Sequence, residues 1–308
     1  MDISTFSEVK NLLDISPQPF TYYKDQYAVD QLMRITRKGP KTVAELKKGR
    51  HRNLLTKPVV RQLLATIPDG KVTPERLQLN WWEKPFSFNR SLGRWGNPSY
   101  LRGNWPQLSR PGFNLVVQLN LTNKVVQMYQ SRLGQGASLP CGFGHPVNSD
   151  FPTLGWARLD FELDGDSVLI EELQSDLVRD VLFNADYART AKEANLHPRY
   201  VKGIANFVKF EFAPYIRLWQ EVLLAHTLDF IDRELGFRQV FLHTWEGGNH
   251  MKNLPANGAP PRSLYQQLPK RFGFQLTDET PDFLLREQDR RLIFKYRNNL
   301  AGYWKLAW

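Results

Sequence analysis

Six consecutive residues, Glu171-Glu172-Leu173-Gln174-Ser175-Asp176, bring three carboxylates, an amide and a hydroxyl together. We call residues 171–176 the acidic motif. The apolar run before it, residues 168–170, is typical of a buried strand. Polar residues at the carboxyl end of such a strand lie at the mouth of an α/β sheet, where ligands usually bind. A carboxylate there is a candidate general base, because burial or neighbouring carboxylates raise its pKa.

The geometry of a strand limits what the acidic motif can do. Side chains alternate between faces, so we expect at most one of Glu171 and Glu172 to face a shared pocket. Gln174 is a candidate for positioning a substrate. Ser175 and Asp176 are consistent with substrate or cofactor binding, and equally with capping a helix that starts at Leu177.

A second polar strand end follows residues 238–244, which have the pattern of a buried strand. His243 is a candidate acid or base there. Trp245 and Asn249 are candidates for substrate contact, because the glycines between them allow close backbone approach. The histidine spacing supports no metal site, and the chain has neither a Walker lysine loop nor a G-x-G-x-x-G motif.

The elements that must position these residues have clear patterns. Two alternating segments flank Gly165-Asp166 and predict a β-hairpin over residues 155–173. Apolar residues at helical spacing predict a long helix over residues 215–235, which ends at Gly236 and leads into the second strand as a β-α-β unit. A short helix over residues 263–271, a strand over 272–276 and a strand-like segment at 292–296 complete the expected C-terminal elements.

The segment Leu264-Tyr265-Gln266-Gln267-Leu268-Pro269-Lys270-Arg271-Phe272-Gly273-Phe274 completes a recognisable order. This order resembles the second half of the GNAT acyltransferase superfamily, over residues 154–277. It consists of a hairpin, a polar strand end, a long helix, a strand and this tyrosine-bearing helix. The resemblance implies that Tyr265 protonates a leaving thiolate and that a carboxylate on the strand ending at Glu172 is the base. Members that use acetyl-CoA have a Gly-rich pyrophosphate loop after that strand. This chain has none there, and the superfamily also contains aminoacyl-tRNA-dependent transferases that need no such loop.

A second resemblance covers residues 168–176. With Trp156-Ala157-Arg158 before them and Trp219 after them, they are similar to an I-E-E-I-Q-S-D-W pattern of uncharacterised bacterial and mobile-element proteins. This chain has Leu177 where the pattern has tryptophan. The pattern brings no established activity.

Charge is concentrated in the N-terminal half of the chain. Residues 1–150 contain 21 Lys and Arg against 10 Asp and Glu, whereas residues 151–308 contain 20 against 21. A basic half favours a nucleic acid or another polyanion as partner, although a solubilising surface explains such a charge equally well. We expect a basic N-terminal region at residues 1–133 and an α/β domain at 134–308, separated by the Gly- and Pro-rich residues 134–153.

The basic region contains two kinds of candidate nucleic-acid contact. Residues 1–80 are predicted to be helical, with a capping box at Thr42–Glu45 and a helix that begins near Pro58, and the two short helices resemble a helix-turn-helix in outline. Residues 81–112 interleave aromatics and arginines, predicting an irregular segment that stacks on bases or anchors a loop. The candidate contacts are Lys47, Lys48, Arg50, Arg52, Arg90, Arg94, Trp95 and Arg102.

Taken together, the sequence predicts an α+β or α/β protein with a mixed sheet and flanking helices. A single cysteine and a start without a signal-peptide pattern predict a cytoplasmic protein, and no apolar run is long enough for a membrane span. The leading functional hypothesis is a GNAT-like transferase that moves an acyl or aminoacyl group onto an amine, with nucleic acid as a partner. Acyl-CoA is the cofactor to test. A non-enzymatic nucleic-acid-binding protein and an interaction scaffold marked by nine tryptophans are the alternatives.

Overall fold

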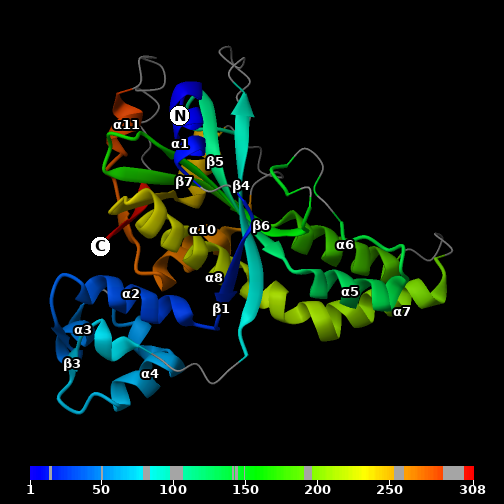
Figure 1. Ribbon diagram of the computed structural model, residues 1–308, viewed down its shortest axis with the longest axis horizontal. Coiled ribbons are helices and arrows are strands. Elements are labelled where there is room, and N and C mark those ends of the chain that lie inside the picture. Colours follow the sequence, from blue (N-terminus) through cyan, green and yellow to red (C-terminus); the bar gives the residue numbers. More distant parts are fainter. Residues whose placement is uncertain are drawn as a thin grey trace.

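The computed structural model of the chain has an α+β architecture, as the sequence predicts (Figure 1). It describes residues 1–13, 16–49, 51–78, 84–97, 107–140, 142, 145–148, 150–190, 196–252, 260–286 and 302–308. Within these ranges one eight-stranded sheet has the order β1-β4-β5-β6-β7-β8-β10-β9. Its strands are β1 (Gln18–Tyr22), β4 (Phe86–Asn97), β5 (Gly112–Leu121), β6 (Thr153–Phe161), β7 (Ser167–Gln174), β8 (Gln239–His243), β9 (Gln275–Thr277) and β10 (Tyr303–Ala307).

Helices surround this sheet. They are α1 (Ile3–Leu12), α2 (Gln26–Thr36), α3 (Val43–Lys48), α4 (Pro58–Ala65), α5 (Asn123–Leu133), α6 (Asp176–Thr190), α7 (Pro198–Asn206), α8 (Ala213–Phe230), α9 (Trp245–Met251), α10 (Arg262–Arg271) and α11 (Asp282–Leu285). None of the helices in the described ranges is both long and apolar enough to cross a membrane.

The predicted hairpin and β-α-β unit are both present. β6 and β7 pair in antiparallel orientation, and the turn between them is closed by a hydrogen bond from Gly165 N to Glu162 O of 3.1 Å. β8 returns parallel to β7 after α6, α7 and α8, and it is the parallel neighbour of an otherwise antiparallel sheet. The long helix ends where predicted, because Gly236 adopts a left-handed φ of 77° that favours glycine.

The chain on both sides of residue 134 contributes to this one sheet. β5, from the expected N-terminal region, pairs with β6, from the expected C-terminal domain, between Leu115↔Leu159 and Asn120↔Thr153. The expected boundary therefore falls between two neighbouring strands.

Two expectations for the N-terminal region are wrong. Residues 86–97, expected to be irregular, form the long strand β4, which pairs with both β1 and β5. Residues 18–22, expected to be helical, form β1. The glycines, asparagines and serines of β4 conceal its pattern, because its conformation is fixed by hydrogen bonds to two neighbours rather than by local preference. The strand expected at residues 292–296 lies outside the described residues.

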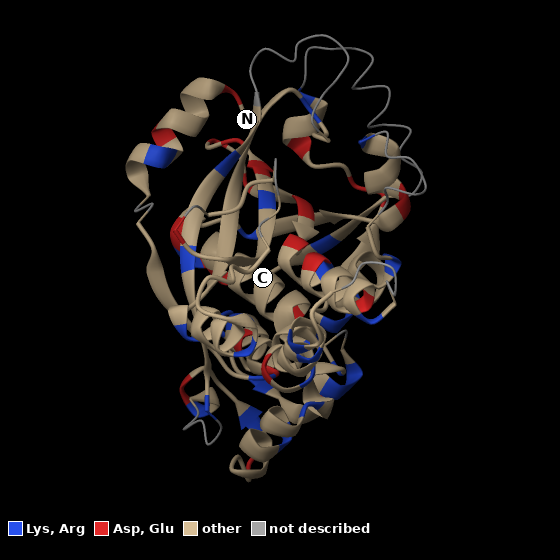
Figure 2. Ribbon diagram, turned by 90° about the vertical axis from the view of Figure 1, so that its right-hand side faces the viewer, with Lys and Arg blue, Asp and Glu red and all other residues tan. Residues whose placement is uncertain are grey.

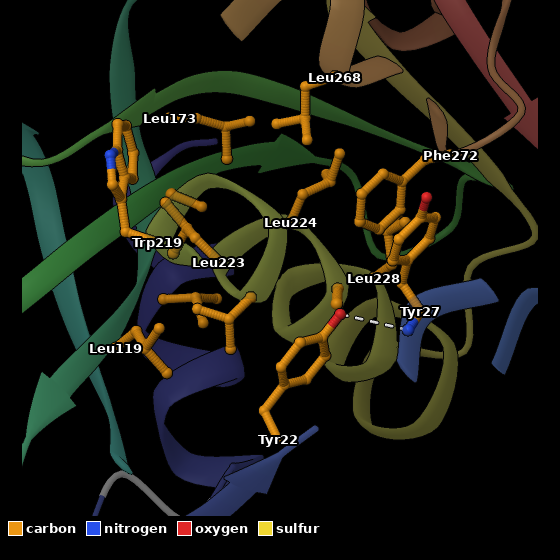
Figure 3. Packing of buried hydrophobic residues seen from close by; sticks show 14 of the residues in the cluster. Tyr22, Tyr27, Leu119, Leu173, Trp219, Leu223, Leu224, Leu228, Leu268 and Phe272 are labelled. Carbon is orange, nitrogen blue, oxygen red and sulfur yellow. Dashed lines mark hydrogen bonds between the residues drawn. The ribbon is translucent and has the colours of Figure 1, made fainter. Parts of the chain in front are cut away.

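The two faces of the sheet differ in chemistry. One face packs its apolar side chains, among them Leu119 and Leu173, against Trp219, Leu223 and Leu224 of α8 (Figure 3). The opposite face, which we call the polar face, is also buried but contains polar and charged side chains. On β6 this alternation separates Ala157, Leu159 and Phe161 from Trp156, Arg158 and Asp160.

Residues 24–77 form a helical unit at one end of the sheet, which we call the basic lobe (Figure 1), and its apolar residues belong to the same core as those of the sheet and α8. It contains α2, α3, α4 and a two-stranded antiparallel sheet of β2 (Lys41–Thr42) and β3 (Lys71–Val72). The lobe is fixed to the end of α8 by ion pairs from Arg34 and Arg37 to Asp232, with N–O distances of 3.2 and 2.8 Å.

Candidate functional site

The parallel strands β7 and β8 separate within the acidic motif. They pair through Ile170↔Leu242, after which β8 ends at His243 and β7 continues to Gln174. The place where parallel strands diverge at their carboxyl ends is the usual position of a ligand site in α/β sheets, and here buried side chains fill it.

Beyond its pairing with β8, strand β7 bonds through its backbone to side chains from distant segments. Lys252 Nζ donates a hydrogen bond to Glu171 O at 2.8 Å. Further along, Leu173 N donates to Tyr265 Oη at 3.1 Å. Tyr265, the expected acid of the GNAT resemblance, is 2% exposed, and burial raises the pKa of its hydroxyl. The hydroxyl therefore keeps its proton and acts on the strand backbone in this structure.

A bulge places both glutamates on the polar face. The register of β7 against β6 shifts so that Leu159 pairs with Ile170 while Arg158 pairs with Glu172, leaving Glu171 as the extra residue. Simple alternation, which predicts opposite faces for Glu171 and Glu172, is therefore wrong at this point.

Glu171 is completely enclosed by hydrogen-bond donors. Its Oε1 accepts from Ser109 N at 3.0 Å, and its Oε2 accepts from Ser109 Oγ at 2.9 Å. His243 Nε2 lies 3.1 Å from the same Oε2. Burial by itself raises the pKa of Glu171, but His243 and the cations Lys252 and Arg158 outweigh it and lower the pKa to about 2. Glu171 is thus a firmly ionised carboxylate.

Glu172 is held by two buried cations. Arg158 Nη2 contacts Glu172 Oε2 and also donates to Gln107 O at 2.8 Å. Lys252 Nζ lies 3.7 Å from the same carboxylate oxygen. Burial opposes ionisation of Glu172, yet the charges of Lys252 and Arg158 lower its pKa. Two carboxylates therefore face two cations in a region shielded from water.

Ser109, His243 and Glu171 have the residue types of a catalytic triad without its geometry. Ser109 Oγ lies 2.9 Å from His243 Nε2, which is the same ring nitrogen that Glu171 approaches. In a triad the serine and the carboxylate contact different ring nitrogens. His243 Nδ1 is buried without a hydrogen-bond partner among the described residues, and burial lowers the pKa of this ring. Glu171 opposes this effect of burial by favouring the protonated ring, with a net decrease in the pKa.

The end of the acidic motif caps α6. Val178 N donates to Ser175 Oγ at 3.1 Å, and the same hydroxyl bonds to Leu154 O. Asp176 accepts from Trp156 Nε1 at 2.9 Å. Burial raises the pKa of Asp176. Hydrogen bonds to the carboxylate, the strongest from Trp156, outweigh burial and lower the pKa overall. Of the two interpretations of Ser175 and Asp176, capping is the one with direct contacts.

The other candidate contacts lie around this opening with separate partners. Gln174 Nε2 donates to Asp176 Oδ1 at 2.5 Å and lies 3.0 Å from His145 Nδ1. Trp245 Nε1 donates to Pro260 O at 2.7 Å. Asn249 is half-buried on α9.

Three members of this cluster were not among the sequence candidates: Ser109, Arg158 and Lys252. Arg158 alternates with apolar residues in a strand, which is a usable signal for a buried cation on the opposite face. Ser109 and Lys252 lie 62 and 81 residues from Glu171 along the chain, and only folding brings them together.

The candidate nucleic-acid contacts are divided between the basic lobe and β4. Lys47, Lys48 and Arg52 are exposed on the lobe. Arg50 and Arg102 lie outside the described residues. Residues 24–77 contain 13 Lys and Arg against 5 Asp and Glu, and Figure 2 shows this concentration of Lys and Arg at the lower end of the molecule.

The β4 candidates contact protein groups instead. Arg90 bonds to Gln18 and lies 3.4 Å from Glu234. Arg94 is exposed, and its guanidinium lies 4.8 Å from the ring centre of Phe113.

Trp95 also packs against a charged group of the chain. The guanidinium of Arg158 lies 5.3 Å from its ring centre. All three β4 candidates therefore have contacts within the protein.

Comparison of the chain with models of protein families, with curated proteins and with solved structures finds no match in any of the three. Its function must therefore be inferred from its own residues.

Proposed function

We propose that this protein binds nucleic acid through the basic lobe. One observation carries the proposal: the lobe presents cations that make no ion pair within the described part of the chain. They are Lys24, Lys38, Lys41, Lys47, Lys48, Arg52, Arg61 and Lys71, and all except Lys41 are exposed. Unpaired cations gathered in one lobe repel one another. The phosphates of a polyanion relieve that repulsion, and release of its condensed counter-ions adds to the affinity.

The distribution of charge favours a binding surface over general solubilisation. The net formal charge of residues 24–77 is +8, against +10 for the whole chain. A solubilising charge would be spread over the surface with both signs mixed. Within the lobe, Asp25 already pairs with Lys57 and Asp69 with Arg76, so these acids are not available to the remaining cations.

The acidic motif fits this function as a structural feature. Glu171 and Glu172 have internal partners, and Ser175 caps α6. Under this proposal the motif holds the loop at Ser109 and helix α9 onto the free edge of β7.

The test measures binding of a fluorescent random-sequence DNA duplex to the whole protein between about 50 and about 200 mM salt. We expect affinity to fall steeply with salt. The triple variant Lys47→Ala, Lys48→Ala, Arg52→Ala should bind more weakly, with a salt slope reduced by about 3, because each lost phosphate contact removes about 0.9.

A matched triple variant provides the control. Lys10, Lys124 and Lys202 are exposed and lie outside the lobe, so changing them to alanine removes the same charge elsewhere. Equal losses in the two triple variants would exclude the lobe as the binding surface. Absence of binding by the unmodified protein at low salt would refute the proposed function itself.

Acyl transfer at the strand opening is a second candidate, favoured by the gathering of Glu171, Glu172 and His243 where β7 and β8 separate. Proton transfer there requires Glu171 or Glu172 to exchange a present partner for the substrate amine. Acyl-CoA would also meet the carboxylate of Asp176 at the electropositive start of α6, where a pyrophosphate would otherwise bind.

Thermal denaturation tests this second candidate. A donor that binds the native protein raises its melting temperature by mass action. Acetyl-CoA and aminoacyl-tRNA are the donors to compare, with free CoA and uncharged tRNA as controls. Acyl transfer predicts a larger shift with the charged donor, and this difference should vanish in Glu172→Gln. Equal shifts from charged and uncharged forms would count against it.

A further inference from the structure

Helix α4 presents a polar face that the fold does not use. Its residues Val60 and Leu63 are buried in the lobe, whereas Arg61, Gln62 and Ala65 are exposed on the opposite side. The side chains of Arg61 and Gln62 make no hydrogen bond or ion pair within the ranges that the structure describes. The helix thus has one face for packing and another that is free for a partner.

Helix α4 is the last α-helix of the lobe, and it packs against α2. The order α2, β2, α3, α4, β3 places it as the third helix of a three-helix unit, and β2 and β3 pair through Lys41↔Val72 and Thr42↔Lys71. In helix-turn-helix proteins the second helix of the pair lies in the major groove. Here residues 49–57 connect α3 to α4, a longer connection than the usual short turn.

We infer that α4 enters the major groove of duplex DNA and that Arg61 and Gln62 contact base edges there. This inference rests on the proposed nucleic-acid binding and names its substrate. An α-helix of about 10 to 12 Å diameter fits the major groove of B-DNA, which is about 12 Å wide. Arginine pairs with guanine O6 and N7, and glutamine pairs with adenine N6 and N7.

Ala65 supports the same geometry. Its small side chain lies one turn beyond Arg61 and lets the helix approach closely, and its methyl group can contact a thymine methyl. Double-stranded RNA does not fit, because its major groove is too deep and narrow for a helix.

Cations on either side of α4 in the chain supply the phosphate contacts. Arg52 precedes the helix and Lys71 follows it, and both are exposed. Phosphate contacts orient a protein on the duplex but do not select a sequence, whereas base contacts do. Loss of a phosphate contact should therefore weaken binding to every duplex, whereas loss of a base contact should weaken binding mainly to the preferred sequence.

The experiment selects bound sequences from a library of duplexes with about 20 randomised base pairs, using the whole protein. We expect enrichment of a sequence that contains guanine and adenine at adjacent positions. The double variant Arg61→Ala, Gln62→Ala should lose roughly 10- to 100-fold in affinity for the enriched duplex. Its affinity for a scrambled duplex should fall only by the small factor expected for one lost cation.

The variant Lys47→Ala, Lys48→Ala is the matched comparison within the lobe. It should weaken binding to the enriched and scrambled duplexes by the same factor. Circular dichroism checks that both double variants are folded, which their exposed positions favour.

Three results would overturn the inference. Binding without any enriched sequence would refute base reading while leaving the proposed function intact. Equal loss on both duplexes in the Arg61 and Gln62 variant would remove these residues from base contact. Tighter binding of single-stranded DNA or of double-stranded RNA would refute the major-groove geometry, and binding to no nucleic acid would refute the proposed function as well.

Discussion

Lys252 shows at the level of single residues why the carboxylates of β7 stay charged inside the protein. Its ammonium group donates to the backbone of β7 and lies near Glu172, while Arg158 contacts the same glutamate. Burial lowers the pKa of Lys252 and the neighbouring carboxylates raise it, with a net decrease. Removing one partner from such a group is costly, because it leaves an uncompensated charge without water. The network therefore makes the fold specific at the opening between β7 and β8.

The first prediction concerns the pH dependence of this network. The pKa of Glu171 is about 2 in the folded protein, below its ordinary value of 4.5. Its contribution to stability is therefore complete above pH 4.5 and is lost as the pH falls toward 2, with a total of about 3 kcal/mol. Urea unfolding measured from pH 7 downward should show this loss, and Glu171→Gln should give a shallower curve.

Exposed Glu246 on α9 provides the control for this measurement. Glu246→Gln should change the free energy of unfolding by no more than about 0.5 kcal/mol at neutral pH, as most surface substitutions do. Parallel curves for Glu171→Gln and the unmodified protein would show that the neighbours of Glu171 do not stabilise its ionised form.

At the level of elements, α6 depends on the hydroxyl that begins it. Ser175 Oγ satisfies Val178 N and bonds to Leu154 O, which joins the start of the helix to β6. Ser175→Ala should lower the free energy of unfolding by about 1 to 2 kcal/mol in chemical denaturation. Ser131→Ala, at an exposed position of α5, is the control and should cost less than about 0.5 kcal/mol. Equal small effects would contradict the capping role.

The elements also show where sequence patterns suffice. The hairpin of β6 and β7 is predictable because Gly165-Asp166 supplies its turn, and α8 is predictable because Gly236 ends it. The capping box at Thr42 is present as expected, with Glu45 bonded back to the helix start. These features depend on neighbours in sequence, and local preference decides them.

Features that depend on distant partners were not predictable. The bulge at Glu171 and the strand β4 exist because neighbouring strands pair with them in a particular register. The buried site has the same origin: its glutamates are visible in the sequence, whereas Ser109 and Lys252 join them only through the fold.

At the level of the whole molecule, a shared hydrophobic core and a set of ion pairs join the basic lobe to the helix and strands beside it. Arg34 of α2 and Arg37, which follows the helix, pair with Asp232 just beyond α8, and Arg238 approaches the same carboxylate. Asp25 N also donates to Glu221 Oε1 of α8 at 2.8 Å. Apolar packing also joins the two parts, since Tyr27 of α2 stacks on Phe272 at a ring-centre distance of 4.2 Å and lies in the same core as Leu228 of α8.

Asp232→Asn tests this arrangement, because it removes the charge that three arginines share. Hydrogen exchange of the whole protein should become roughly ten-fold faster or more in α2, since a buried pair that loses one partner is destabilised by several kcal/mol. Amides of β5 and β6 should keep their protection. The exposed Asp186→Asn variant removes the same charge from α6 and should leave α2 unchanged. Equal acceleration in α2 and in β5 and β6 would show instead that lobe and sheet unfold as one cooperative unit.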